Sequence, residues 1–315
     1  MFNLKSILGI LLSALCVWWA FKDFQLSSFL SIINEIRLFY LILITCLLWI
    51  SVWLRSFRWK YLFQSSYGLD VFSLYRAEMV GHFGNNVLPL RLGELMRAFM
   101  VSKDRKVSKS YVIGTIILER AIDAISLIII AVYLIIISPY DIFLIKNIFW
   151  IIFSLLVVII SMSLISIFIK NVKSEIRFLK HIRELFSGIR SMKFSAVLPV
   201  ILLSILIWLI YLLNIYFLQY AFNFNLDFIQ ILMILVFSYL ALGVPAAPGM
   251  IGTYHAAIKF TIVDLFGLSS AQGNAFALVS HAYGYILLTL IGLYYFMKGQ
   301  FNIEVISKII KKNRI

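Results

Sequence analysis

The chain has 315 residues, of which 63 % are hydrophobic, and its net charge is +14. Soluble domains are about 45–50 % apolar, whereas several apolar runs here reach the roughly 20 residues that a helix needs to cross a bilayer. This composition excludes an ordinary soluble domain and indicates an all-α polytopic membrane protein, with a single transmembrane domain over residues 1–315. The basic residues form no domain that could bind nucleic acid, so we expect them in cytoplasmic loops that meet anionic lipid.

The apolar runs predict about six full transmembrane helices. They fall at residues 6–21, 38–54, 111–138, 147–169, 197–222 and 274–297. Cys16 and Cys46 lie inside two of these runs, and their spacing fits no metal or redox motif, so both are expected to be packing residues. The N-terminal run resembles a signal peptide, and Cys16 could mark it as a lipoprotein signal. However, Leu15 occupies the position before this cysteine, where a lipoprotein site needs a small residue. An uncleaved first helix is therefore predicted.

Two further segments are broken rather than continuous. Residues 75–101 divide at Pro89 into arms of 14 and 13 residues, and each arm would be about 20 Å long as a helix, short of the roughly 30 Å hydrocarbon core. Residues 228–266 divide in the same way at residues 245–249. Each pair of short arms predicts a re-entrant hairpin, which a membrane tolerates only where protein or a water-filled cavity surrounds it.

The distribution of Lys and Arg predicts the topology. Every second segment between the predicted membrane segments is rich in basic residues. These segments, which include the two termini, hold 20 Lys and Arg, whereas the loops between them hold three. This asymmetry places both termini in the cytoplasm of a multi-pass cell-membrane protein. The first hairpin must then open to the cytoplasmic side and the second to the outer side. Residues 170–193, whose apolar positions recur at helical spacing, are expected to lie on the membrane surface as a cytoplasmic amphipathic connector.

The opposite orientation of the two hairpins predicts an inverted repeat. One half covers residues 38–138 with its hairpin at 75–101, and the other covers residues 197–297 with its hairpin at 228–266. Each break also contains a proline followed four residues later by a glycine, Pro89 and Gly93 in one and Pro248 and Gly252 in the other. In transporters built from such repeats, the binding site lies where the breaks meet near the middle of the membrane.

The breaks also predict a ligand. Proline suits the first turn of a helix, so Pro89 and Pro248 are each expected to begin the second arm of a hairpin. Two helix N-termini would then offer free N–H groups and partial positive charge to an anion, and Arg91 and Arg97 would add full charges. An anionic head group, such as a phosphate or diphosphate, is the predicted guest. The alternative is that the two arginines neutralise Glu94 and the acidic pair of the next helix, and both can hold.

That acidic pair lies in the run at residues 111–138. Glu119 and Asp123 are four residues apart on one helix face, and Arg120 stands between them. Each charge at the centre of a membrane helix costs roughly 2.5–3.5 kcal/mol. The three groups should therefore face the protein interior and pair with the arginines of the first hairpin. They would act either as an ion-pair lock or as a relay for protons or the head group.

The histidines do not predict a metal site. His82 and His255 each lie near a break, but two scattered histidines do not make a zinc site. We expect His255 to form hydrogen bonds in the cavity and His281 to be a satisfied interior residue. No metal and no cofactor is expected, and the chain contains no HExxH and no phosphate-binding GxxxxGK[ST].

Three blocks of these residues resemble a known family. In chain order they are Asn86-x-x-Pro89-x-Arg91-x-Gly93-Glu94-x-x-Arg97, Glu119-Arg120-x-x-Asp123 and Pro245-x-x-Pro248-Gly249-x-x-Gly252. They resemble the flippase-like membrane domain of lysylphosphatidylglycerol synthases, over about residues 1–300. That family includes standalone bacterial and archaeal proteins, so the chain looks like a standalone member.

The resemblance implies lipid translocation, since the membrane domain of the synthase is thought to move the aminoacylated lipid to the outer leaflet. Standalone members look tied to lipid-linked sugars, isoprenoid-type lipids or cell-envelope assembly. We expect no aminoacyl-transferase domain beside this membrane domain, so no lysine transfer is inferred. Met250 and His255 stand where the family usually has a glycine and a glutamate, and at these positions the substrate or its head group would differ.

The sequence thus predicts a lipid flippase or transporter rather than an enzyme, acting on a membrane phospholipid or a polyprenyl-linked lipid. The predicted head-group site comprises Asn86, Pro89, Arg91, Gly93, Glu94, Arg97, Pro248, Gly249, Gly252 and His255. Two alternatives remain open. One is an intramembrane enzyme or glycosyltransfer accessory that uses Glu94, Glu119 or Asp123 as acid or base. The other is a non-catalytic scaffold, with a second copy of the chain or envelope-synthesis enzymes as partners.

Overall fold

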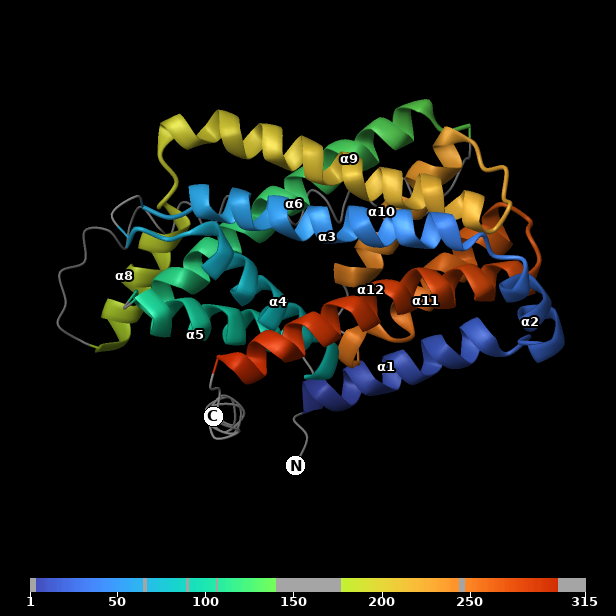
Figure 1. Cartoon of the computed structure of the whole chain (residues 1–315), viewed down its shortest axis with the longest axis horizontal. Coiled ribbons are helices and arrows are strands. Elements are labelled where there is room, and N and C mark those ends of the chain that lie inside the picture. The colour runs from blue at the N-terminus through green and yellow to red at the C-terminus, as the bar shows by residue number, and fades with distance from the viewer. Residues whose placement is uncertain are drawn as a thin grey trace. The chain divides into compact units, whose positions relative to one another are not determined.

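The computed structural model describes residues 4–64, 67–88, 91–105, 107–139, 177–243 and 247–299. Over these ranges the secondary structure is entirely helical (Figure 1). The elements are α1 Leu4–Phe21, α2 Leu26–Asn34, α3 Leu38–Tyr61, α4 Val71–Val87, α5 Gly93–Arg105, α6 Lys109–Ile137, α8 Arg177–Ile189, η3 Phe194–Ala196, α9 Val197–Ala221, α10 Phe228–Gly243, η4 Pro248–Met250, α11 Thr253–Lys259, η5 Phe260–Leu265 and α12 Ser270–Lys298. The predicted helix at 147–169 lies outside the described residues, as do Pro89 and Pro245.

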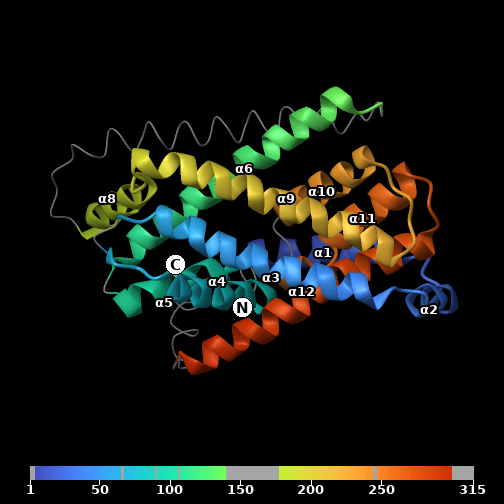
Figure 2. The ribbon, with the colours of Figure 1, turned by 45° about the horizontal axis from the view of Figure 1, so that its top comes forward.

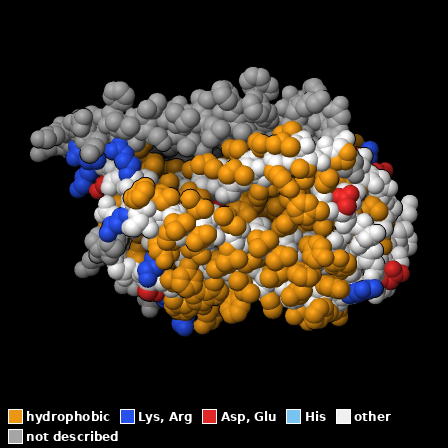
Figure 3. Space-filling model, turned by 90° about the horizontal axis from the view of Figure 1, so that it is seen from above, with side chains coloured by type: hydrophobic (Ala, Val, Ile, Leu, Met, Phe, Trp, Pro, Cys, Tyr) orange, Lys and Arg blue, Asp and Glu red, His pale blue; other side chains and the backbone are white. Residues whose placement is uncertain are grey.

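Four stretches among the described residues are long and apolar enough to cross a membrane: α3, α6, the continuous stretch of η3 and α9, and α12. Shorter apolar helices are the Ile10–Phe21 part of α1 and α10. Large hydrophobic side chains are exposed along the helices, and they form a broad patch on the described part of the face seen in Figure 3. An all-α membrane protein is therefore confirmed, whereas six full spans and an inverted repeat stay predictions.

The contacts of the chain divide it into two compact units. Unit 1 contains Met1–Val52, Tyr75–Arg97 and Ile210–Ile315, and unit 2 contains Trp53–Leu74 and Ala98–Leu209. The units do not follow the order of the predicted halves, because unit 1 takes residues from both of them. Unit 1 includes both breaks, and unit 2 includes the acidic pair of α6.

The first hairpin consists of α4 and α5, with 17 and 13 residues, or about 25 and 20 Å of helix. Its two arms touch at small residues. A Cβ added at Gly84 would lie 2.6 Å from the Cα of Gly93, and one added at Gly93 would overlap the Gly81 carbonyl. The predicted pair of short arms around a break is thus observed, and the glycines allow the two backbones to approach each other.

The predicted surface helix, α8, packs on α6 within unit 2. The two helices meet where a Cβ at Gly188 would overlap the Tyr111 carbonyl and one at Gly114 would overlap the Leu185 carbonyl. Ser108 donates a hydrogen bond of 2.5 Å to the carboxylate of Glu184 beside this contact. The amphipathic pattern predicted the helix correctly, but it did not indicate that α6 would be its packing partner. Figure 2 shows α8 beside the first turns of α6.

We expect Gly188→Ala to lower the melting temperature of the purified protein, because the new Cβ must push α8 away from the backbone of α6. Overpacking of this kind typically costs about 1–3 kcal/mol. Gly243→Ala is the matched control, since no atom of the described residues lies within 4 Å of a Cβ at that position. Tryptophan fluorescence during heating in detergent measures both variants, and equal melting temperatures would contradict the observed α6–α8 packing.

Candidate functional site

The first break lies between α4 and α5. Arg91 has a φ of 56°, in the left-handed region that residues other than glycine seldom adopt. A right-handed helix cannot include such a residue, and α5 accordingly begins at Gly93. The backbone N–H groups of Leu95 and Met96 both donate to the Leu92 carbonyl. The second arm therefore begins at Gly93, four positions after the start at Pro89 that the sequence predicted.

The second break is also caused by residues whose backbone lies in the left-handed region. Gly249, Met250 and Gly252 have φ values of 68°, 59° and 97°, so the chain makes only a short 3₁₀ turn at Pro248. α11 begins at Thr253, five residues after the proline that was predicted to start it. The glycines are also required by space, because a Cβ at Gly249 would overlap the ring of Tyr285 and one at Gly252 would overlap the carbonyl of Ser13.

The two breaks lie against the same stretch of α12, all within unit 1. From the first break, the Asn86 side chain donates to the hydroxyl of Thr289 at 2.8 Å, and the Tyr285 hydroxyl donates to the Asn86 carbonyl at 3.2 Å. From the second break, the Gly249 carbonyl lies 2.7 Å from Nε2 of His281. A Cβ at Gly249 would also be only 3.6 Å from the Asn86 carbonyl oxygen. Asn86 of the first break and Gly249 of the second thus meet on α12, whereas the location of this place near the middle of the membrane stays a prediction.

Buried charges surround the first break. The guanidinium of Arg97 is 2 % exposed and lies 2.6 Å from the Glu78 carboxylate, with Glu94 at 3.6 Å. His82 approaches the other oxygen of Glu78 at 3.9 Å. The alternative that the sequence left open therefore holds for Arg97, whose charge is matched by Glu94 and, at shorter distance, by Glu78. Glu78 was not among the predicted site residues, although it faces Arg97 across the hairpin.

Aromatic and imidazole rings pack at the second break. His255 is buried, accepts a hydrogen bond from the Gly252 N–H at 3.4 Å, and packs edge to face against the ring of His281 at 4.9 Å. Tyr254 stacks on His281 at 5.2 Å and donates its hydroxyl hydrogen to Ser280 at 3.1 Å. His255 therefore lies at the break as predicted. No group of three or more His, Cys, Asp or Glu among the described residues could hold a metal ion.

Helix α1 packs on α11 and supplies partners to the second break (Figure 1). The Ala247 N–H donates to the Ser13 hydroxyl at 2.7 Å. The buried ammonium of Lys259 donates to Asp23 at 3.1 Å and to the Trp19 carbonyl at 3.0 Å. None of these residues was predicted for the site. The one sequence signal was Lys259 itself, a lone lysine in an apolar run. A buried ammonium requires a partner, so this lysine indicated that another polar group lies beside it.

The acidic pair of α6 has its partners in unit 2. Glu119 is fully buried and lies 2.9 Å from Arg55, and Asp123 lies 2.6 Å from Arg58. Arg120, 39 % exposed, approaches Asp123 at 3.4 Å. The prediction that Glu119 faces the interior is confirmed, but its expected partners were the hairpin arginines. Arg55 and Arg58 take that place because they are three residues apart near the end of α3, on one face toward α6.

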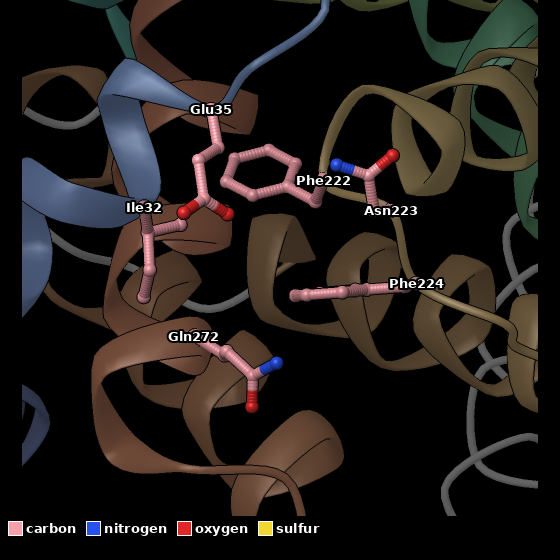
Figure 4. A pocket seen from close by; sticks show the side chains of 6 residues that line it. All are labelled: Ile32, Glu35, Phe222, Asn223, Phe224 and Gln272. Carbon is pink, nitrogen blue, oxygen red and sulfur yellow. The ribbon is translucent and has the colours of Figure 1, made fainter.

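A separate small pocket lies in unit 1 (Figure 4). Its lining residues are Ile32, Glu35, Phe222, Asn223, Phe224 and Gln272. In Figure 4 the side chains of Glu35, Phe224 and Gln272 point toward a shared space. None of the predicted site residues lines this pocket, so the breaks and the pocket are distinct features.

The structure distributes the predicted site residues over both units. Within unit 1, Asn86, Arg91, Gly93, Glu94 and Arg97 lie at the first break. Pro248, Gly249, Gly252 and His255 lie at the second. Glu119, Arg120 and Asp123 belong to unit 2. Ser13, Glu78, His281, Tyr285 and Thr289 contact the breaks and were not predicted as site residues.

These features define an all-helical membrane protein with two broken helices that meet on a third. A family model described as the lysylphosphatidylglycerol synthase TM region matches residues 6–292, and the chain belongs to this family. The match confirms the resemblance carried by the three sequence blocks. Comparisons with curated proteins and with solved structures found no significant match.

We expect Arg58→Leu to prevent recovery of folded protein, because it leaves the carboxylates of Asp123 and Glu119 short of a buried partner. Removing one member of a buried ion pair typically costs about 3–5 kcal/mol. Arg120→Gln is the matched control: it removes a more exposed arginine from the same Asp123, and exposed pairs contribute about 0–1 kcal/mol. The yield of monodisperse protein in size-exclusion chromatography distinguishes the two, and equal yields would contradict this assignment.

Proposed function

We propose that this protein is a lipid flippase of the cell membrane, which moves a lipid with an anionic or sugar-linked head group between leaflets. The observation that carries the proposal is the contact of two broken helices on α12. Irregular backbone is tolerated at membrane depth where it is buried in protein or lines a cavity. In secondary transporters, discontinuous helices of this kind form the substrate site.

Arg91 and the start of α5 are assigned to the anionic part of the head group. Arg97 is buried against Glu78, so its charge serves the hairpin rather than the ligand. Arg91 is half-buried, and its left-handed backbone is an uncommon conformation of the kind that clusters at ligand sites. The first N–H groups of the 13-residue helix α5 lie two positions further on, and a helix N-terminus attracts an anion.

The remaining predicted residues have supporting roles in this proposal. Gly93, Gly249 and Gly252 allow the close approach of the breaks, and Asn86 joins the first break to α12. Glu119 and Asp123, together with Arg55 and Arg58, form an ion-pair lock within unit 2. The lipid tail would stay in the bilayer. Cytoplasmic termini and hairpins that open on opposite faces complete the proposed transport path.

Reconstitution in liposomes tests this function. Vesicles with trace fluorescent phosphatidylglycerol, or a fluorescent polyprenyl phosphate, are treated with a membrane-impermeant quencher. We expect the quenched share to rise from the outer-leaflet fraction toward completion only when the protein is present. Arg91→Gln should slow this step by at least about tenfold, because a hydrogen bond to a charged group contributes about 1.5–3 kcal/mol.

Arg37→Gln is the control for this assay, since it removes an exposed arginine that lies outside both breaks. It should leave the rate unchanged. No movement of either lipid by monodisperse wild-type protein would overturn the flippase proposal. An Arg91→Gln rate equal to that of wild type would remove Arg91 from the site.

A further inference from the structure

Three side chains form a polar stripe on α12. His281, Tyr285 and Thr289 are spaced four residues apart, so they lie on one face of the helix. Each has a polar atom at one of the two breaks: His281 at the Gly249 carbonyl, Tyr285 at the Asn86 carbonyl and Thr289 at the Asn86 amide. One face of one helix therefore holds both breaks.

The contacts of this stripe are neutral hydrogen bonds. The Asn86 amide also donates to the Tyr285 carbonyl at 3.3 Å. Neutral hydrogen bonds can be exchanged for similar ones to the oxygen atoms of a ligand, with little change in free energy. The buried Arg97–Glu78 pair behaves differently, since separating it would leave charges without a partner in a poorly solvated place. The stripe therefore joins the two breaks through contacts that can open and close.

The packing also indicates where the opening would stop. One helical turn beyond Thr289, a Cβ at Gly292 would overlap the Met79 carbonyl and lie 2.6 Å from Cβ of Phe83. The rings of Phe83 and Phe296 pack at 5.4 Å in the same region. At this point α4 and α12 are in close backbone contact, whereas around Asn86 side-chain hydrogen bonds join them.

We infer that the stripe His281–Tyr285–Thr289 is a reversible latch, which closes the site by binding Asn86 and Gly249 and releases Asn86 when a lipid head group enters. The Gly292–Met79 contact is the pivot. In the open state the freed Asn86 amide and the Thr289 and Tyr285 hydroxyls bind head-group oxygen atoms. This inference rests on the proposed flippase function and adds to it the element that must move.

Cross-linking tests the latch. In a background with Cys16→Ala and Cys46→Ala, the pair Asn86→Cys and Thr289→Cys is joined by a short, reducible bis-thiosulfonate reagent. We expect cross-linking to slow transport of fluorescent phosphatidylglycerol at least tenfold, and reduction to restore it. Undiminished transport by fully cross-linked protein would overturn the latch. Leu290→Cys, an exposed neighbour, treated with the same reagent, should transport normally.

A second measurement decides the matter if the paired cysteines alone stop transport. Thr289→Cys is labelled with a polar thiosulfonate in vesicles with and without phosphatidylglycerol or polyprenyl phosphate. Opening of the latch predicts faster labelling with a lipid that enters the site, and an unchanged rate at Leu290→Cys. Equal rates at Thr289→Cys in all vesicles would overturn the latch. Wild-type transport in the same vesicles is read separately, and its absence would count against the flippase proposal.

Discussion

A broken helix in a membrane protein frees backbone N–H and C=O groups that hydrocarbon cannot satisfy, and the architecture of unit 1 follows from this constraint. The Gly249 carbonyl is met by His281, the Asn86 carbonyl by the Tyr285 hydroxyl and the Ala247 N–H by Ser13. Helices α1 and α12 thus supply the partners that water would supply in a soluble loop. The breaks persist because their neighbours satisfy them.

Charge follows the same rule in both units. Glu78 is matched by Arg97 across the first hairpin, Lys259 by Asp23 beside the second, and Glu119 by Arg55 in unit 2. An isolated buried charge would be far more costly than any of these pairs. These pairings divide the charged residues between structure and function. Arg97 and the α6 cluster stabilise their units, and Arg91 is the residue assigned to the proposed head-group site.

Sequence reasoning failed where partners come from distant segments. The positive-inside rule counts basic residues without saying where their side chains point, so it did not predict that Arg55 and Arg58 would pair with α6. A long arginine side chain on the last turns of α3 reaches α6. The starts of α5 and α11 were misplaced because left-handed residues such as Arg91 and Met250 carry no strong sequence signal. α8 was correctly recognised, but the glycine contacts that place it on α6 join residues far apart in the chain.

The sequence by itself determined the membrane class, the family, the two breaks and the charged residues around them, because hydropathy, proline and glycine act locally along the chain. Only the tertiary structure decided which groups meet. In the structure, Asn86 and Gly249 lie against one face of α12, and Arg97 forms an ion pair with Glu78. Such pairings depend on helix rotation and on approach distance. These are set by packing among many residues at once rather than by any local pattern.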